Sequence, residues 1–219
     1  MWSLTYLVAN VCGSVVITAL GYAGVEVVPT WVLAVSALVL WGPFIGVLLW
    51  TSKRRGSGNF ARDFSLNFQA KDLWGVPLGV ACQLLLVVVV TLPFRWLFPS
   101  LFNSEAVEKR ANDLFDAAHG AWIVLLVVIV VVCAPVVEEI VYRGFIQHNL
   151  GVAYGARISV MLASFWFAAV HLQLAEFPGL FAFALVLGVC FARTKRLGLS
   201  IVTHVAFNAT ALFVMALTR

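Results

Sequence analysis

The chain has 219 residues, of which 63% are hydrophobic and 11% are charged, and its mean hydropathy is +1.01. A soluble domain carries about 25% charged residues, so this composition excludes that class and indicates a polytopic membrane protein. A net charge of +4 would suggest a nucleic-acid partner in a soluble protein. Here the basic residues lie in two loops between apolar segments, where they indicate how the chain is oriented in the membrane. We therefore expect no nucleic-acid partner.

Seven apolar segments are predicted to form an all-α membrane bundle. A helix needs about 20 apolar residues to cross the hydrocarbon layer. The candidates lie near residues 3–24, 31–52, 73–98, 121–150, 156–173, 178–194 and 197–217. This count of about seven helices, with a range of six to eight, leaves no room for a soluble domain. The chain is therefore expected to be one integral membrane domain.

The two basic loops predict the topology. Lys53, Arg54, Arg55, Arg62 and Lys71 lie in one loop, and Arg193, Lys195 and Arg196 lie in the other. If both loops are cytoplasmic, seven helices place the N-terminus inside and the C-terminus outside. If the number of spanning helices differs by one, the orientation of the C-terminal half is inverted. The first segment has no basic residues before it and is expected to be a retained anchor of a multi-pass plasma (inner) membrane protein. The four cysteines lie singly in apolar segments and are expected to be packing residues.

Residues 103–116 are the only stretch with the character of a soluble helix. Their spacing of apolar and basic side chains predicts a short amphipathic helix along the membrane interface, with Ala106, Val107, Arg110, Leu114 and Phe115 as its key positions. Such a helix could gate a site between the spanning helices or could be a plain connector.

Two carboxylates and a guanidinium, Glu138, Glu139 and Arg143, follow the uncharged run Trp122–Val137. A charge at the centre of a membrane helix costs roughly 2.5–3.5 kcal/mol, so such groups usually mark function. Glu139 and Arg143 are four residues apart and share a helix face, whereas Glu138 points about 100° away. We expect Glu139 and Arg143 to form a structural ion pair and Glu138 to be free to exchange a proton. The alternative is that both glutamates belong to one salt-bridge network.

His171 ends the next apolar helix and shares a face with Phe167. Counted from the turn at residues 151–155, Glu138 lies about thirteen residues back and His171 about sixteen forward. At 1.5 Å per residue these depths differ by about 4–5 Å, so an antiparallel helix pair can bring the two side chains together. This assumes that the preceding helix runs unbroken past Gly144. The alternative is a histidine that only forms a hydrogen bond between helices.

His204 and Asn208 are also four residues apart and share a face of the last helix. They place an imidazole and a carboxamide side by side, although either could simply hold helices together. His119 and His148 fall at segment ends, and we expect both to be solvated.

Together, Glu138, His171, His204 and Asn208 are sufficient for amide hydrolysis by either of two mechanisms. In one, Glu138 and His171 activate water while His204 and Asn208 donate hydrogen bonds to the oxyanion, and no cofactor is required. In the other, Glu138, His171 and His204 hold zinc and its activated water. The residues contain no compact HExxH spacing, so the sequence favours the metal-free route slightly.

Three motifs in this order resemble the CPBP family of intramembrane proteases, which includes CAAX proteases and bacteriocin-processing enzymes and is also called Abi. They are Glu138-Glu139-x-x-x-Arg143, Phe167-x-x-x-His171 and His204-x-x-x-Asn208. The resemblance implies a helical bundle around a polar cavity, with residues 121–219 as the catalytic core and residues 1–120 as N-terminal helices and the interfacial segment. It implies catalytic roles for Glu138, His171, His204 and Asn208, with Glu139, Arg143 and Phe167 in support. The family's metal requirement is debated.

The predicted substrate is a peptide or the tail of a membrane protein that enters from the lipid bilayer. Eukaryotic relatives cleave prenylated proteins, but no prenyl-binding groove can be identified in this sequence. The rival interpretation is a non-enzymatic transporter or partner-binding scaffold whose buried Glu and His residues relay protons. It does not explain why an acid, a base and an amide donor occur together.

Overall fold

The computed structural model describes residues 2–25, 27–102, 113, 118 and 120–217. Every element in this part of the chain is helical, which confirms the predicted all-α bundle. The predicted interfacial helix of residues 103–116 lies outside the described residues apart from Asp113, and His119 also lies outside them.

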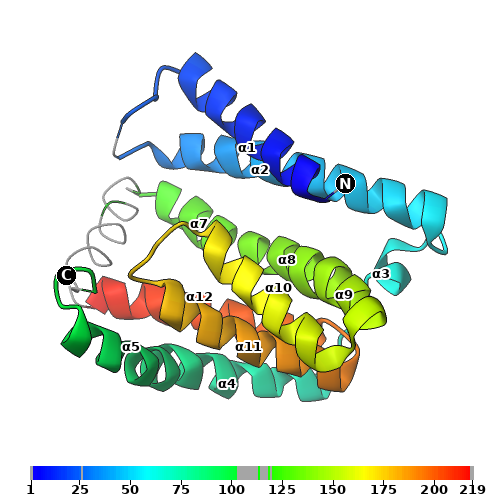
Figure 1. The fold of residues 1–219 in the computed structure, drawn as a ribbon. Helices are drawn as coiled ribbons and strands as arrows, with labels where there is room; N and C mark the ends of the chain where they lie inside the picture. Colours follow the sequence, from blue (N-terminus) through cyan, green and yellow to red (C-terminus); the bar gives the residue numbers. More distant parts are fainter. Residues whose placement is uncertain (1, 26, 103–112, 114–117, 119, 218–219) are drawn as a thin grey trace.

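All seven predicted segments are helices (Figure 1). In chain order the elements are α1 (Trp2–Ala19), α2 (Thr30–Arg55), α3 (Phe60–Asp63), η1 (Ala70–Trp74), α4 (Gly75–Ala81), η2 (Cys82–Leu86), α5 (Val87–Leu97), α7 (Trp122–Val127), η3 (Val128–Cys133), α8 (Ala134–Glu139), η4 (Ile140–Gln147), α9 (His148–Tyr154), α10 (Ala156–Val170), α11 (Phe177–Thr194) and α12 (Gly198–Leu217).

Within the described residues, five helices are long and apolar enough to cross a membrane. They are Thr30–Arg55, Ala70–Leu97, Trp122–Tyr154, Phe177–Thr194 and Gly198–Leu217. Two further apolar helices, Leu4–Ala19 and Ala156–Val170, are shorter. The predicted segments are therefore correct in position, and the first and fifth are shorter as helices than the sequence pattern suggests.

The helix from Trp122 to Tyr154 lies between two groups of helices. The α1–α2 hairpin lies on one side of it, and α12, α11 and the α4–α5 helix lie on the other (Figure 1). Small residues allow α4 to approach α12 closely, because a Cβ atom added at Gly79 would lie 2.3 Å from the carbonyl oxygen of Thr203. Close backbone contact of this kind is typical of helices in membranes.

The long helix runs unbroken past Gly144, as the depth argument requires, but it contains two unpredicted π-helical segments. These are η3 and η4, and they flank the short α8 that ends in Glu138 and Glu139. Single π-turns inside α-helices occur frequently at functional sites. Gly144 does not break the helix. The missing side chain of Gly144 allows the backbone at Phe64 to approach the long helix, since a Cβ atom added at Gly144 would lie 3.0 Å from the carbonyl oxygen of Phe64.

The two basic loops lie at the same end of the bundle. Arg196 forms an ion pair with buried Asp72, and the N–H of Leu197 donates to the carbonyl of Ser65 at 2.9 Å. These contacts agree with the prediction that both loops share one side of the membrane. That this side is the cytoplasm stays a prediction.

Candidate active site

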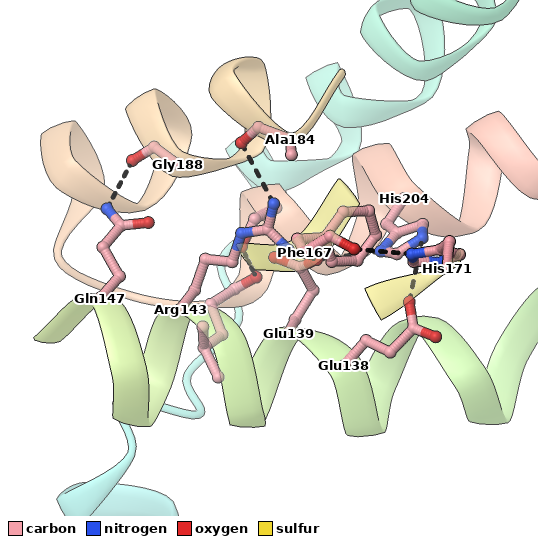
Figure 2. A network of polar contacts seen from close by, with 11 residues as sticks. Glu138, Glu139, Arg143, Gln147, Phe167, His171, Ala184, Gly188 and His204 are labelled. Atoms are coloured by element: carbon pink, nitrogen blue, oxygen red, sulfur yellow. Dashed lines mark hydrogen bonds and ion pairs between the residues drawn. The ribbon is translucent and has the colours of Figure 1, made fainter. Parts of the chain in front are cut away.

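The centre of the site is Glu139, whose side chain is fully buried. Its Oε1 atom accepts a hydrogen bond from Arg143 Nη1 at 2.8 Å and lies 2.9 Å from His204 Nδ1 (Figure 2). The predicted Glu139–Arg143 ion pair is confirmed. Because a carboxylate only accepts, Nδ1 is the protonated nitrogen of His204 in this contact. Glu139 therefore fixes both the orientation and the tautomer of the His204 ring.

Arg143 connects this pair to α11 and α10. Its Nη2 donates to the carbonyl of Ala184 at 3.1 Å, and its guanidinium carbon lies 4.8 Å from the centre of the Phe167 ring. The side chain is 1% exposed, so its charge is compensated by Glu139 and by these contacts rather than by water.

Gln147 is a site-supporting residue that the sequence analysis missed. It is buried, and its Nε2 donates to the carbonyl of Gly188 at 2.8 Å. Figure 2 shows Gln147, Arg143 and the two glutamates projecting from one helix, with Gln147 and Arg143 directed to α11 carbonyls. Arg143 and Gln147 bind carbonyls one helical turn apart, Ala184 and Gly188. The sequence signal that could have identified Gln147 is its four-residue spacing from Arg143, which places both side chains on one face of the helix.

Glu138 has different surroundings from Glu139, as the helix geometry predicts. Its side chain is 26% exposed, and its Oε2 lies 3.7 Å from His204 Nε2. This distance is too long for a hydrogen bond but is close enough for electrostatic attraction when the ring is protonated. The two ring nitrogens of His204 thus face the two carboxylates, Nε2 toward Glu138 and Nδ1 toward Glu139.

His171 lies at the C-terminal end of α10, and its Nδ1 is 2.6 Å from the carbonyl oxygen of Phe167. Since a carbonyl accepts, Nδ1 carries a proton, which leaves Nε2 of the neutral ring as an acceptor. Phe167 is 1% exposed, and its ring also meets that of Tyr142 edge to face, with ring centres 5.1 Å apart. It lies against both catalytic histidine candidates, 4.7 Å from His171 and 5.8 Å from His204 between ring centres.

Glu138 and His171 line one cavity of about 240 Å³. The other lining residues are Tyr6, Asn10, Leu40, Trp41, Phe44, Val137, Val141, Tyr142 and Val170. The structure thus brings the two side chains to the same space, as the comparison of their depths predicts.

Asn208 is held in a different contact. Its Nδ2 donates to the carbonyl of Val130 at 2.8 Å, within the π-helical segment η3, and it does not line the cavity of Glu138. One of its two amide hydrogens is thereby used to hold α12 against η3. Its part in an oxyanion hole stays a prediction. His148 is exposed, as predicted.

The candidate zinc ligands do not form a ready metal site. Among the residues that the structure describes, no three His, Cys, Asp or Glu side chains are gathered closely enough to hold a metal ion. His204 and Glu138 approach each other, but His171 does not complete a set with them.

Comparison with known proteins relates part of the chain to a family. Residues 120–210 match the family model of type II CAAX prenyl endopeptidases, Rce1-like. Searches of curated proteins and of solved structures found no significant match. The matched region contains every predicted site residue and indicates a peptidase, and the long apolar helices indicate an integral membrane protein. The predicted resemblance to the CPBP family is therefore confirmed for residues 120–210, which are similar to the Rce1-like type II CAAX prenyl endopeptidases.

Proposed function

We propose that the protein is an intramembrane endopeptidase that hydrolyses a peptide bond with water activated by Glu138 and His171. The observation that carries the proposal is the shared cavity of these two side chains, with His204 Nε2 3.7 Å from Glu138 Oε2. Glu138 supplies a partly exposed carboxylate and His171 supplies an imidazole acceptor in the same cavity. Groups of these two types can remove a proton from water.

In the proposed reaction, Glu138 takes one proton from a water molecule, and Nε2 of His171 accepts a hydrogen bond from the same water. The water oxygen then attacks the scissile carbonyl carbon and forms a tetrahedral intermediate. Glu138 finally returns its proton to the leaving amine as the C–N bond breaks. The products are a carboxylic acid and an amine, and one water is consumed.

His204 is the proposed donor to the oxyanion. Nδ1 of this ring is held by Glu139, so donation from Nε2 requires a doubly protonated ring. The carboxylates of Glu138 and Glu139 lie beside that ring and compensate its charge. One positioned donor of this kind is typically worth about 10²–10³ in rate. Asn208 is proposed as a second donor through its remaining amide hydrogen.

The proposal is tested with purified protein in detergent and a library of quenched peptides. The wild type should cleave a subset of the peptides, and cleavage in ¹⁸O-labelled water should place one ¹⁸O atom in the new carboxyl group. Glu138→Gln should slow cleavage by about 10²–10⁴, whereas Glu176→Gln, the same chemical change outside the cavity lining, should leave the rate close to that of the wild type. Equal loss in both variants would contradict the assignment of Glu138.

A further inference from the structure

A second cavity lies at the end of the bundle that carries the basic loops. Its volume is about 370 Å³, compared with about 240 Å³ for the cavity of Glu138 and His171. The two linings share no described residue. The second cavity is formed by η4 and α9, the start of α10 and the end of α11, with Ser65 from the first basic loop, and these elements meet at one end of the bundle (Figure 1). The proposed peptide hydrolysis does not use this space.

The charge of the second cavity favours an anion. The ionisable side chains in its described lining are His148 and Lys195, and both are exposed to solvent. No Asp or Glu is among the described lining residues, so the walls would not repel a negative group. Ser65 adds a hydroxyl group to the same lining. A phosphate group would therefore find hydrogen-bond donors on three side chains, and hydrogen bonds to an ionised group are the strong ones.

The first turn of α10 adds a favourable dipole. Ala156 and Ser159, both in that turn, line the second cavity. The residue before the helix is Gly155, which has no side chain to cap the first N–H groups. Those N–H groups have no partner within a helix, and together with the helix dipole they attract anions.

Two lining residues have an unusual backbone conformation that other contacts hold in place. Ser65 and Lys195 both have a φ of 56°, in the left-handed region that favours glycine. The carbonyl of Ser65 accepts a hydrogen bond from the N–H of Leu197 at 2.9 Å, and the N–H of Lys195 donates to the carbonyl of Phe191 at 2.8 Å. Strained positions of this kind cluster at ligand-binding sites. The donor side chains of Ser65 and Lys195 therefore project from fixed backbone positions.

The buried side of the second cavity offers hydrogen-bond acceptors. Gln147 is 3% exposed, and its Oε1 atom has no hydrogen-bond partner among the described residues. Ser159 is 2% exposed, and its Oγ donates to the carbonyl of Ala156 at 2.9 Å, which leaves the lone pairs of Oγ available. A buried acceptor without a partner is unfavourable, and a hydroxyl group of a ligand can satisfy it. The cavity thus combines exposed cationic groups with buried acceptors.

A glycerol phosphate group matches this arrangement in size and in chemistry. At about 30 Å³ per water molecule, a cavity of about 370 Å³ corresponds to roughly twelve water molecules, and glycerol phosphate has about ten non-hydrogen atoms. Its phosphate would lie at the exposed basic groups, and its hydroxyl groups would reach the buried acceptors. Lipids present such groups at the level of the loops that flank membrane helices, and basic pockets between helices bind anionic head groups.

We propose that the second cavity binds the glycerol phosphate head group of an anionic phospholipid. Lys195, His148 and Ser65 donate hydrogen bonds to the phosphate. Gln147 and Ser159 accept hydrogen bonds from the glycerol hydroxyl groups. This site is separate from the proposed protease site, and its test does not require peptide cleavage.

The test counts the lipids bound to the protein in a neutral detergent by native mass spectrometry, during titration with phosphatidylglycerol or phosphatidylcholine. Phosphatidylcholine has a phosphate but lacks the hydroxyl groups and the net negative charge. The wild type should bind one phosphatidylglycerol with a Kd at least about tenfold lower than that for phosphatidylcholine, since one hydrogen bond to a charged group is worth about that factor. Equal Kd values for the two lipids would overturn the inference.

Lys195→Gln removes one cationic donor and should raise the Kd for phosphatidylglycerol about tenfold. Arg193→Gln is the matched control, because it removes the same charge two residues away from a side chain that does not line the cavity. Its Kd should stay close to that of the wild type. Equal weakening in both variants would show general attraction by the basic loop and would rule out this site.

Gly151→Leu tests the cavity without a change of charge. Gly151 lines the cavity, and a Cβ atom added there would lie 3.5 Å from Ser159 Oγ, which is ordinary van der Waals contact. The leucine side chain should fill the space and abolish the preference for phosphatidylglycerol. Ala153→Leu, at an exposed position of the same helix outside the lining, should keep the preference. A preference retained in Gly151→Leu would contradict the assignment.

A measurement on the wild type alone covers the case in which a variant fails to fold. Phosphatidylglycerol with a photoreactive head group is bound and irradiated, and the attachment sites are mapped by mass spectrometry. Attachment within residues 147–159 or 191–195 is expected, and attachment only elsewhere would overturn the inference.

Calorimetric titration with soluble glycerol phosphate distinguishes the two sources of the group. Binding of the lipid alone would identify the membrane as the source. Binding of soluble glycerol phosphate that Lys195→Gln weakens would identify a water-soluble ligand of the same chemistry at the same site.

Discussion

Replacement of Arg143 by methionine tests the buried ion pair at the centre of the site. The substitution removes the hydrogen bonds to Glu139 and to the carbonyl of Ala184, together with the contact over Phe167. Glu139 is fully buried, and its Oε2 atom has no hydrogen-bond partner. After the substitution the carboxylate would retain the contact with His204 alone.

Removing one partner of a buried pair typically costs about 3–5 kcal/mol, because the other charge remains buried and uncompensated. We therefore expect Arg143→Met to lower the free energy of unfolding by that amount. Arg143→Lys keeps the charge but lacks the planar fork that reaches both Glu139 and Ala184, and should cost about 1.5–3 kcal/mol. The double variant Glu139→Gln, Arg143→Met removes the unpaired charge and should be more stable than Arg143→Met alone.

The assay is reversible unfolding in mixed micelles, followed by circular dichroism and by near-ultraviolet signals. The double-variant comparison is decisive, since it isolates the energy of the pair from the loss of packing. The reasoning is refuted if Arg143→Met unfolds within about 0.5 kcal/mol of the wild type, a shift within the usual range for surface substitutions. It is also refuted if the double variant is destabilised by the sum of the two single changes.

Three further predictions concern other parts of the molecule. Glu138→Gln should lower kcat by about 10²–10⁴ with an unchanged unfolding midpoint, and cleavage close to that of the wild type would be inconsistent with its role as base. Phe167→Ala should destabilise the protein by about 3–5 kcal/mol, whereas Phe165→Ala, at a 55% exposed ring on the same helix, should cost far less; equal unfolding midpoints would argue against the packing described here. Hydrogen bonds from Ser52 and Ser57 lower the pKa of Asp63 to about 2. The ionised Asp63 therefore stabilises the fold at pH values above its ordinary pKa of 3.8, and this stabilisation is lost as the pH falls through about 2. Asp63→Asn should remove that part of the acid-induced loss in thermal stability, and identical pH profiles would contradict the assignment.

The local features of this protein could be predicted from its sequence because they depend on spacing along one helix. Composition identified the apolar segments, and the four-residue spacing of Glu139 and Arg143 predicted an ion pair that the structure contains. The different surroundings of Glu138 followed from the same helix geometry.

The features that could not be predicted depend on how helices pack. The π-helical segments η3 and η4 lie in runs whose residue types are equally compatible with α-helix. The contact of His204 with Glu139 and that of Asn208 with the carbonyl of Val130 join residues more than sixty positions apart. The cavity wall from α1 and α2 likewise requires the docking of a hairpin whose sequence carries no catalytic motif.

The most direct test of the central claim is peptide cleavage by the wild type and Glu138→Gln, each with and without a strong chelator. We predict that the wild type retains full cleavage in chelator and that Glu138→Gln cleaves about 10²–10⁴ times more slowly than the wild type in both conditions. Cleavage lost in chelator and restored by zinc would contradict the account, because Glu138, His171 and His204 would then act as metal ligands rather than as proton-exchanging and oxyanion-binding groups.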